Sequence, residues 1–440
     1  MLGFSNTRKW VYPLRMPGLF SRIHKFTSLA LVAFLVLVPW IRIGGEPLFL
    51  ADVGARRLIA FGNIFTASDG VLILISALLA AFGLFFFTSI FGRLWCGYTC
   101  PQSVFMINLV FPVDEWLEGP RALRAKRDAG PWTFDKAWRK VAKWTIFAVF
   151  AIFVSMSFMG FFAPTELLWT GQASATQYSI VGFFSALWFI DFAWYREQVC
   201  NYICPYARFQ GALTDKHSLV ISYDETRGEP RGKAARERGG CIDCNKCVVV
   251  CPQGIDIRDG YQLECIACGK CIDACTSVME RIGHPTLVRY STEAADAGEP
   301  RRSLLRGRTV AYGGLLAVLL AAFIGVVATH SPIEVQVDRA PGSLFVEDAD
   351  GYVRNTYLVH VTDRQRGSDA RVYVVAVQGL PEGSQVRARP LSLSRSERGH
   401  VPVIVRVPRD QAERTVPLTV TVRGEGVEVA ARTTFKGPGN

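Results

Sequence analysis

The stretch CIDCNKCVVVCPQGIDIRDGYQLECIACGKCIDAC, residues 241–275, decides what kind of protein the sequence encodes. It contains the run Cys-x-x-Cys-x-x-Cys-x-x-x-Cys twice, and the second copy begins 24 residues after the first. Three thiolates spaced in this way wrap one [4Fe–4S] cluster, while the fourth is carried to a neighbouring cluster. Zinc is the main alternative, but structural zinc sites usually separate paired cysteines by a long loop. The repeated run therefore predicts two [4Fe–4S] clusters.

The spacing also assigns each cysteine of the run to a cluster. The expected ligands of cluster one are Cys241, Cys244, Cys247 and Cys275. The expected ligands of cluster two are Cys251, Cys265, Cys268 and Cys271. Pro252 follows the first copy, whereas Thr276 stands at the matching place after the second, and this departure leaves every ligand in place. Pairs of clusters of this kind move single electrons.

The other four of the 12 cysteines form a second repeated motif. CGYTCP at 96–101 and CNYICP at 200–205 both read Cys-x-Tyr-x-Cys-Pro, and they lie 104 residues apart. If each pair continues a helix, its two sulfurs share one face. The four thiols in question are Cys96, Cys100, Cys200 and Cys204. Such thiols bind Cu(I), zinc or iron–sulfur clusters, or cycle between dithiol and disulfide. The repeat favours a metal or redox role over structural thiols, but the spacing leaves a copper ion, an extra cluster and a disulfide open.

Five apolar stretches are long enough to cross a lipid bilayer, which needs about 20 helical residues. They are Thr27–Ile43, Gly70–Gly92, Trp144–Ala163, Ser179–Tyr195 and Thr309–Thr329. Runs such as VLILISALLAAFGLFFF are rare in soluble domains, so we expect an α-helical bundle of five transmembrane helices. Each Cys-x-Tyr-x-Cys-Pro motif follows the second span of a pair, so the membrane part is predicted to be an internal repeat.

The distribution of charge orients these helices. Residues 1–26, 93–143 and 196–308 hold 31 Lys and Arg against 20 Asp and Glu, which is the whole net charge of +11. Basic loops stay in the cytoplasm, so we expect these segments there and residues 330–440 in the periplasm of a bacterial inner membrane. The surplus is thus a membrane-insertion signal and no footprint of nucleic acid. The reducing cytoplasm also argues against structural disulfides.

The predicted domains follow from these patterns. We expect a membrane domain over 1–210, an α+β segment with two clusters over 211–308 and the fifth span over 309–329. Residues 330–440 alternate in period two through runs such as YVRNTYLVHVTD, which predicts a β-sandwich of about seven strands. It has His360 and His400 but no evident cluster of metal ligands, so we expect a packing or docking module. Motifs for haem attachment, nicotinamide binding or ATP hydrolysis are lacking.

Asp191 is an acidic residue inside the fourth predicted span. A carboxylate at that depth is costly and often functional, for example in proton transfer from a quinol. The alternative is a structural pair with Arg93 or Arg196, which lie at the ends of spans. The sequence leaves the role of Asp191 open.

Several stretches together resemble one known family. They are GRLWCGYTCPQSVF at 92–105, REQVCNYICPYARFQGALTD at 196–215, ISYDETRGEPRG at 221–232, the cysteine run at 241–275 and the C-terminal sandwich. In this order they are similar to the cytochrome c oxidase accessory protein family of the CcoG/FixG/RdxA type, which consists of membrane-bound polyferredoxins. The resemblance covers nearly the whole chain.

The resemblance implies a fold, an activity and partners. The C-terminal domain of the family is Ig-like, and its members are thought to reduce Cu(II) to Cu(I) for assembly of cbb-type cytochrome c oxidase. The implied partners are that assembly machinery, including a copper-transporting P-type ATPase and copper chaperones. Cys96, Cys100, Cys200 and Cys204 would then be the copper-handling thiols of a cupric reductase. The electron donor and the oligomeric state, including a homo-oligomer, stay open.

Two other functions remain compatible with the sequence. One is an electron conduit from quinol to a periplasmic reductase, as in more distant relatives that share the double motif. The other is a non-catalytic assembly factor of the oxidase, in which the clusters sense the redox state.

Overall fold

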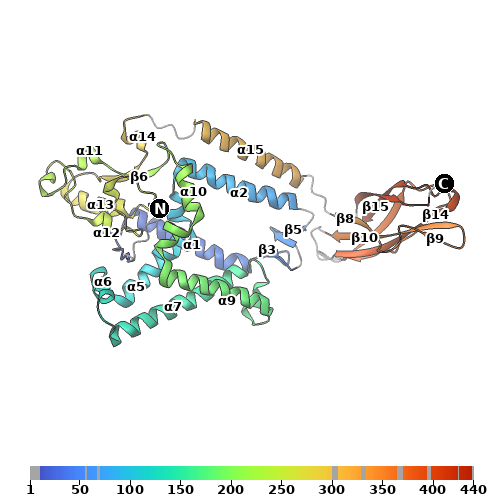
Figure 1. Ribbon diagram of the computed structural model, residues 1–440, viewed down its shortest axis with the longest axis horizontal. Coiled ribbons are helices and arrows are strands. Elements are labelled where there is room, and N and C mark those ends of the chain that lie inside the picture. Colours follow the sequence, from blue (N-terminus) through green and yellow to red (C-terminus); the bar gives the residue numbers. More distant parts are fainter. Residues whose placement is uncertain are drawn as a thin grey trace. The chain divides into compact units, whose positions relative to one another are not determined.

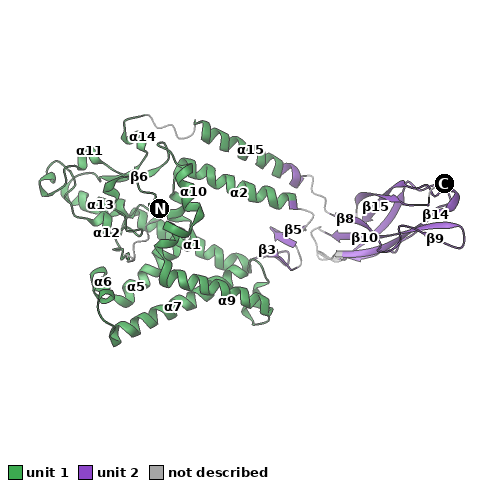
Figure 2. Ribbon diagram, viewed as in Figure 1, with its two compact units in different colours: residues 1–40, 71–323 green, residues 41–70, 324–440 purple. Residues whose placement is uncertain are grey.

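The computed structural model describes residues 10–54, 57–66, 70–299, 306–328, 333–363, 370–393, 398–424 and 426–438. The chain divides into two compact units (Figure 2). Unit one joins residues 1–40 to 71–323, and unit two joins residues 41–70 to 324–440. The membrane helices and the cysteine-rich segment, which we expected as separate domains, therefore pack into a single compact unit.

Five helices are long and apolar enough to cross a membrane (Figure 1). They are α1 (Leu19–Leu37) with the 3₁₀ turn η1 (Val38–Trp40), α2 (Gly70–Phe91), α7 (Phe134–Met159), α9 (Ala175–Ile190) with the π-helical turn η4 (Asp191–Tyr195), and α15 (Gly307–Ala328). Most of their side chains are not covered by protein, as lipid-facing helices require. The five predicted spans are thus confirmed, although Thr329 lies outside the described residues.

Four of these helices, α1, α7, α9 and α15, begin earlier than hydropathy predicts, and the difference is largest for α1 and α7. Helix α1 starts at Leu19 rather than Thr27, because the Asp273 carboxylate accepts hydrogen bonds from the backbone N–H of Phe20 (3.1 Å) and Ser21 (2.8 Å). Such a carboxylate satisfies donors that the first helical turn leaves free. Helix α7 starts at Phe134 rather than Trp144. A prediction from hydropathy ends each span at the first charged residues, whereas the helices continue through those residues.

The segments that carry the Cys-x-Tyr-x-Cys-Pro motifs are broken helices. The first consists of α3 (Leu94–Tyr98), α4 (Pro101–Phe105) and the π-helical turn η3 (Met106–Val110). The second consists of the π-helical turn η5 (Val199–Ile203) and α10 (Pro205–Leu213). Cys100 and Cys204 are extended at ψ 126° and ψ 113°, and a proline begins the next helix after each. The helix does not continue unbroken past either cysteine pair, because proline favours the first position of a new helix and disfavours helical backbone before it.

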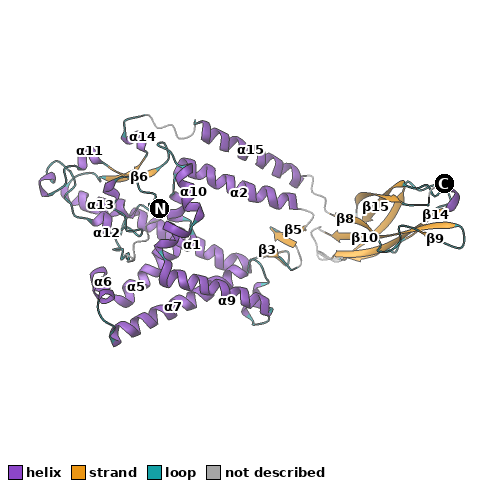
Figure 3. Cartoon of the chain, viewed as in Figure 1, coloured by secondary structure: helices purple, strands orange, loops and turns teal. Residues whose placement is uncertain are grey.

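Short helices complete unit one. They are α5 (Phe111–Glu118), α6 (Arg121–Ala129), α8 (Thr165–Trp169), α11 (Glu225–Gly228), η6 (Lys233–Ala235), α12 (Lys246–Val249), η7 (Ile257–Asp259), α13 (Lys270–Met279), η8 (Glu280–Ile282) and α14 (Glu293–Asp296). In the cysteine-rich segment the strands β6 (Val220–Tyr223) and β7 (Val288–Ser291) pair antiparallel. Helices α12 and α13 each begin inside a cysteine run, so the α+β character predicted for this segment is present (Figure 3).

Unit two contains two small sheets that the sequence did not predict. The strands β1 (Arg42–Ile43) and β2 (Glu46–Pro47) form one hairpin. The strands β3 (Phe49–Asp52), β4 (Arg57–Ala60) and β5 (Asn63–Thr66) form a three-stranded antiparallel sheet. The sequence predicts no strand here and assigns Arg42–Ile43 to the first span, because strands this short give no clear period-two pattern.

The C-terminal part of unit two is the predicted β-sandwich. One sheet has the order β12-β14-β10-β8, with β9 paired to β10, and the other has the order β13-β11-β15-β16. The strands are β8 (Ile333–Arg339), β9 (Val346–Glu347), β10 (Tyr352–Asp363), β11 (Arg371–Gln378), β12 (Gln385–Arg387), β13 (Leu391–Leu393), β14 (Arg398–Pro408), β15 (Val416–Gly424) and β16 (Val427–Phe435). Alternate residues of these strands build a buried core rich in valine. This alternation is the sandwich signature that the sequence carries.

Candidate redox centre

The four expected ligands of cluster one line a single small cavity. These residues are Cys241, Cys244, Cys247 and Cys275. They come from the first run and from helix α13, so the fold brings the fourth thiol back to the first three. Ile242 and Val278 form apolar walls. Cys244 is exposed, which places one edge of this cavity at the protein surface.

The four expected ligands of cluster two line a second cavity. These residues are Cys251, Cys265, Cys268 and Cys271. Three of them are buried, and the Cys251 sulfur faces the backbone N–H groups of residues 253–255. Ile221 and Ile255 cover this cavity, and Cys247 lines both cavities, so the two sites are neighbours.

Four thiols line each of the two apolar cavities, which is the number of ligands that one [4Fe–4S] cluster takes. In the described part of the chain, no three His, Cys, Asp or Glu side chains are placed to hold one metal ion. A [4Fe–4S] cluster needs wider spacing, because each thiolate binds a different iron. Burial raises the pKa of Cys265 to about 12 and that of Cys268 to about 11, so binding of a cationic group must accompany loss of their protons. The donor set and its burial fit two [4Fe–4S] clusters.

The fold also brings together the thiols of the two Cys-x-Tyr-x-Cys-Pro motifs. The Cys200 thiol interacts electrostatically with Cys100, Cys96 and Cys204. Cys96 and Cys100 each interact with Cys204 as well as with one another. We call these four residues the four-thiol site. The two halves of the predicted internal repeat therefore come together at their cysteine pairs, which the sequence alone did not establish.

Two glutamines hold the four-thiol site together. The Cys96 thiol donates to Gln210 Oε1 at 3.2 Å, and Arg93 Nε donates to the same oxygen at 2.7 Å. In the opposite direction, Gln102 Nε2 donates to Asp191 Oδ1 at 3.0 Å and to the Arg196 carbonyl at 2.9 Å. Each motif is therefore tied to the other by a buried or half-buried amide side chain.

These contacts revise one expectation about Asp191. Its Oδ1 is hydrogen-bonded to Gln102, whereas the Arg93 side chain bonds Gln210 and the Ala207 carbonyl. Arg196 directs its guanidinium to Asp114, with Nη–Oδ distances of 2.7 and 3.2 Å. The Asp191 carboxylate thus accepts from the Gln102 amide, and Arg196, one of the two expected partners, reaches Asp191 through its backbone N–H while its guanidinium binds Asp114.

The first motif makes a close contact with the loop of cluster two. A Cβ at position 97 would lie 2.6 Å from the Ile266 carbonyl oxygen, so only glycine fits here. Next to it, the Tyr98 hydroxyl donates to the Cys268 carbonyl at 3.1 Å. The Tyr290 hydroxyl donates to the Ala267 carbonyl at 2.6 Å and lies 3.2 Å from that of Tyr98. The four-thiol site and the loop of cluster two are thus in direct backbone contact.

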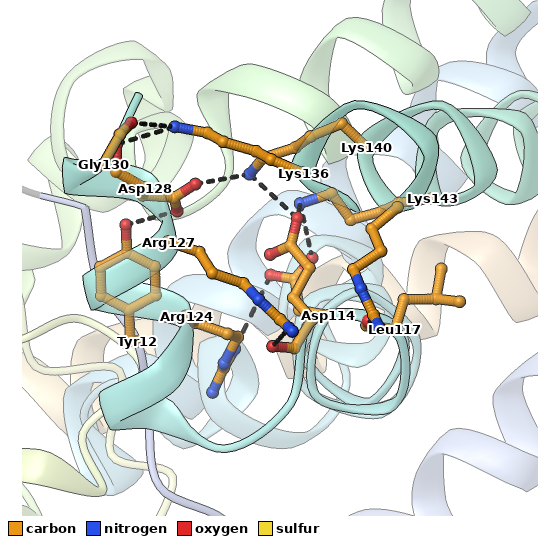
Figure 4. Close-up of polar contacts among 12 residues, drawn as sticks. Tyr12, Asp114, Leu117, Arg124, Arg127, Asp128, Gly130, Lys136, Lys140 and Lys143 are labelled. Atoms are coloured by element: carbon orange, nitrogen blue, oxygen red, sulfur yellow. Dashed lines mark hydrogen bonds and ion pairs between the residues drawn. The ribbon is translucent and has the colours of Figure 1, made fainter. Parts of the chain in front are cut away.

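A network of charged side chains links α5, α6 and α7 (Figure 4). Arg196, which precedes the second motif, joins this network through Asp114. Asp114 on α5 binds Arg196 and lies 3.3 Å from Lys143 on α7. Lys140 bridges Glu118 and Asp128, at 2.9 and 2.8 Å. Burial alone would raise the pKa of Asp114, but Arg196 and Lys143 outweigh burial and hold this pKa below its usual value. Because Arg196 lies just before η5, the network positions the start of this turn, which contains Cys200.

Burial disfavours ionisation of two thiols of the four-thiol site. It raises the pKa of Cys96 to about 12 and that of Cys200 to about 12, and the neighbouring thiols add to the effect. A bound cation would favour loss of these two protons. A soft ion such as Cu(I) fits sulfur donors of this kind.

Together, the fold and these sites define a class. The chain is a multi-pass membrane iron–sulfur protein with a C-terminal Ig-like domain: residues 195–293 match the "4Fe-4S dicluster domain" family, and residues 323–438 match the "IG-like fold at C-terminal of FixG" family.

Similarity to whole proteins then narrows the family. The chain is 33% identical to the nitrogen fixation protein FixG of Rhizobium meliloti (strain 1021), over 85% of this chain and 80% of that protein. It is 34% identical to the protein RdxB of Cereibacter sphaeroides, over 98% and 97%, and 34% identical to RdxA of the same organism, over 84% and 82%. The chain therefore belongs to the FixG/RdxA/RdxB family, as the motifs predicted.

Proposed function

We propose that this protein reduces Cu(II) to Cu(I) at the four-thiol site, with electrons supplied by two iron–sulfur clusters. When bound, the clusters supply single electrons, and one electron reduces one Cu(II). The observation that carries the proposal is the contact of Gly97 and Tyr98 with the backbone of residues 266–268. This contact joins the four-thiol site to the loop that holds cluster two, the predicted electron carrier.

The residues of each cavity have separate tasks in this proposal. Cys241, Cys244, Cys247 and Cys275 hold cluster one, and Cys251, Cys265, Cys268 and Cys271 hold cluster two. The exposed position of Cys244 supports cluster one as the place where the donor delivers electrons. The contact described above supports cluster two as the neighbour of the four-thiol site.

The thiols favour the reduced ion. Sulfur donors bind Cu(I) more strongly than Cu(II), which raises the reduction potential of the bound ion. When Cu(I) binds, it displaces the thiol protons, and these are released into the solvent. Since no three ligands are placed for one ion within the described residues, the proposal places copper on two sulfurs of the four-thiol site.

The cellular setting is part of the proposal. The basic segments 1–26, 93–143 and 196–308 support a cytoplasmic location of both the clusters and the four-thiol site in a bacterial inner membrane. The Ig-like domain then lies in the periplasm. The Cu(I) product would pass to a copper-transporting P-type ATPase and copper chaperones for assembly of cbb-type cytochrome c oxidase.

The test is anaerobic Cu(II) reduction by the full-length protein in lipid vesicles. Cys96→Ser with Cys100→Ser should abolish reduction while the cluster absorbance and iron content persist, and Thr99→Ser is the matched control. If the double variant loses its clusters, alkylation of the four free thiols in the intact protein replaces it. Reduction that survives loss of these thiols contradicts the proposal. Activity with quinol alone would favour the conduit, and inactivity with every donor would favour the assembly factor.

A further inference from the structure

The outer face of one sheet of the sandwich carries a pair of histidines. Strand β10 alternates, so that Tyr357, Val359 and Val361 enter the core while the residues between them point outward. His360 is one of the outward residues. On the neighbouring strand β14, His400 is exposed. The core pattern of the strands therefore fixes which face both imidazoles occupy.

The register of the strands places these two histidines directly opposite each other. His360 is the partner of His400 in the β10–β14 pair, and their ring centroids are 5.8 Å apart. Opposed residues on antiparallel strands have Cβ atoms about 4.5–5.5 Å apart. At this distance two imidazoles can share one ion without movement of the backbone.

A carboxylate and an amide stand behind one of the rings. Asp338 on β8 lies 3.7 Å from His360 Nε2 through Oδ2. Gln336 Nε2 donates to the same carboxylate at 3.3 and 3.2 Å. The 3.7 Å between Asp338 and His360 is longer than a hydrogen bond, and a small rotation of either side chain would close it. A carboxylate that accepts from one ring nitrogen keeps the proton there and leaves the other nitrogen, Nδ1, free to bind a metal, which is the usual support of a metal-binding imidazole.

We propose that His360 and His400 form a surface site for a divalent transition-metal ion, with Asp338 as the residue that orients His360. Imidazole pairs suit Cu²⁺, Ni²⁺ and Zn²⁺, and Cu²⁺ binds most tightly in this order of ions. The protein supplies two ligands and water supplies the others, because no third His, Cys, Asp or Glu in the described residues completes a group around one ion. The site is separate from the four-thiol site and does not depend on the reductase activity proposed above.

The test uses Cu²⁺ as the probe on the full-length protein, with its clusters oxidised and its free thiols alkylated. Pulsed EPR then counts the imidazole nitrogens coupled to Cu²⁺, and equilibrium titration measures the affinity. We expect two coupled imidazoles in the parent protein. His360→Ala or His400→Ala should leave one and weaken binding at least about tenfold, and Asp338→Asn should weaken it by about tenfold or more through loss of orientation.

His284→Ala is the matched control, because His284 lies in the cysteine-rich segment and not in the sandwich. It should leave both the nitrogen count and the affinity unchanged. All three sandwich residues are on the surface of the sheet or partly exposed, so the variants should fold. An imidazole count that is zero in the parent, or that stays at two when both histidines are replaced, overturns the proposal. If the copper-reduction test fails, the histidine site can still be present, and if the histidine site is absent, copper reduction at the four-thiol site can still occur.

Discussion

The two Cys-x-Tyr-x-Cys-Pro segments share one pattern but differ in what surrounds them. In the first, Tyr98 is 9% exposed and bonds the carbonyl of Cys268. In the second, Tyr202 is 65% exposed. The same sequence motif therefore serves two surroundings, one packed on the loop of cluster two and one open to its environment. We infer that the first segment receives electrons and the second admits copper.

The difference starts with one residue in each motif. Gly97 allows helix α3 to approach the backbone of Ile266, whereas Asn201 occupies the equivalent place in η5. The second segment is held instead by charge, through Arg196 and Asp114. Docking thus holds the first half of the repeat and an ion pair holds the second, while Gln102 and Gln210 join the two halves.

The largest expected effect comes from breaking the ion pair. Asp114→Asn removes one partner of a buried pair and leaves Arg196 uncompensated, which should cost about 3–5 kcal/mol of stability. Thermal unfolding in detergent measures the loss. Because Arg196 precedes η5, maleimide labelling of Cys200 and Cys204 should accelerate more than labelling of Cys96 and Cys100.

The control for this variant is Asp135→Asn. Asp135 also pairs with arginine, but its side chain is 51% exposed, so the unfolding temperature should change little. Equal acceleration of labelling at both cysteine pairs in Asp114→Asn would contradict the idea that the charge network holds only the second segment.

A smaller effect of the same carboxylate should appear on acidification. The neighbouring cations hold the pKa of Asp114 below its usual value against the opposing effect of burial. Its stabilising contribution is therefore complete above the usual pKa of about 3.9 and is lost as the pH falls through the lowered pKa. Unfolding temperatures measured from pH 7 downward should fall more steeply below pH 4 in the parent protein than in Asp114→Asn. Parallel curves would show that Asp114 does not contribute in this way.

The smallest expected effect concerns the two tyrosines. Tyr98→Phe removes a hydrogen bond to the Cys268 carbonyl, which is worth about 1 kcal/mol, so copper reduction should slow severalfold. Tyr202→Phe changes an exposed residue and should leave the rate as it was. The comparison of the two initial rates is the measurement. A larger loss in Tyr202→Phe would reverse the roles assigned to the two segments.

Local patterns in the sequence predicted the parts that depend on local spacing. The cysteine runs grouped the thiols that line each cavity, the apolar runs located five spans and the alternation in YVRNTYLVHVTD located β10. Each of these signals extends over a few tens of residues at most. These local patterns are reliable because their physical causes also act over short stretches of chain. The causes are the reach of a cluster ligand and the burial of one face of a helix or strand.

The parts that could not be predicted depend on contacts far apart in the chain. Gly97 is constrained by Ile266, and the start of α1 is fixed by Asp273, more than 160 residues away in either case. The π-helical turns and the pairing of Asp191 with Gln102 arise from the same tertiary packing. Gly97 was visible in the motif as a possible point of close approach, but only the fold shows what approaches it.

Single-turnover oxidation of the reduced protein by Cu²⁺ tests the central claim most directly. Gly97→Val should force α3 away from the loop of cluster two and slow the reaction markedly, with iron content unchanged, because electron transfer slows as donor and acceptor move apart. Asn201→Val, at the equivalent position, should keep the parent rate. A parent-like rate in Gly97→Val with intact clusters would contradict the assignment of the first segment as the point where electrons reach the thiols.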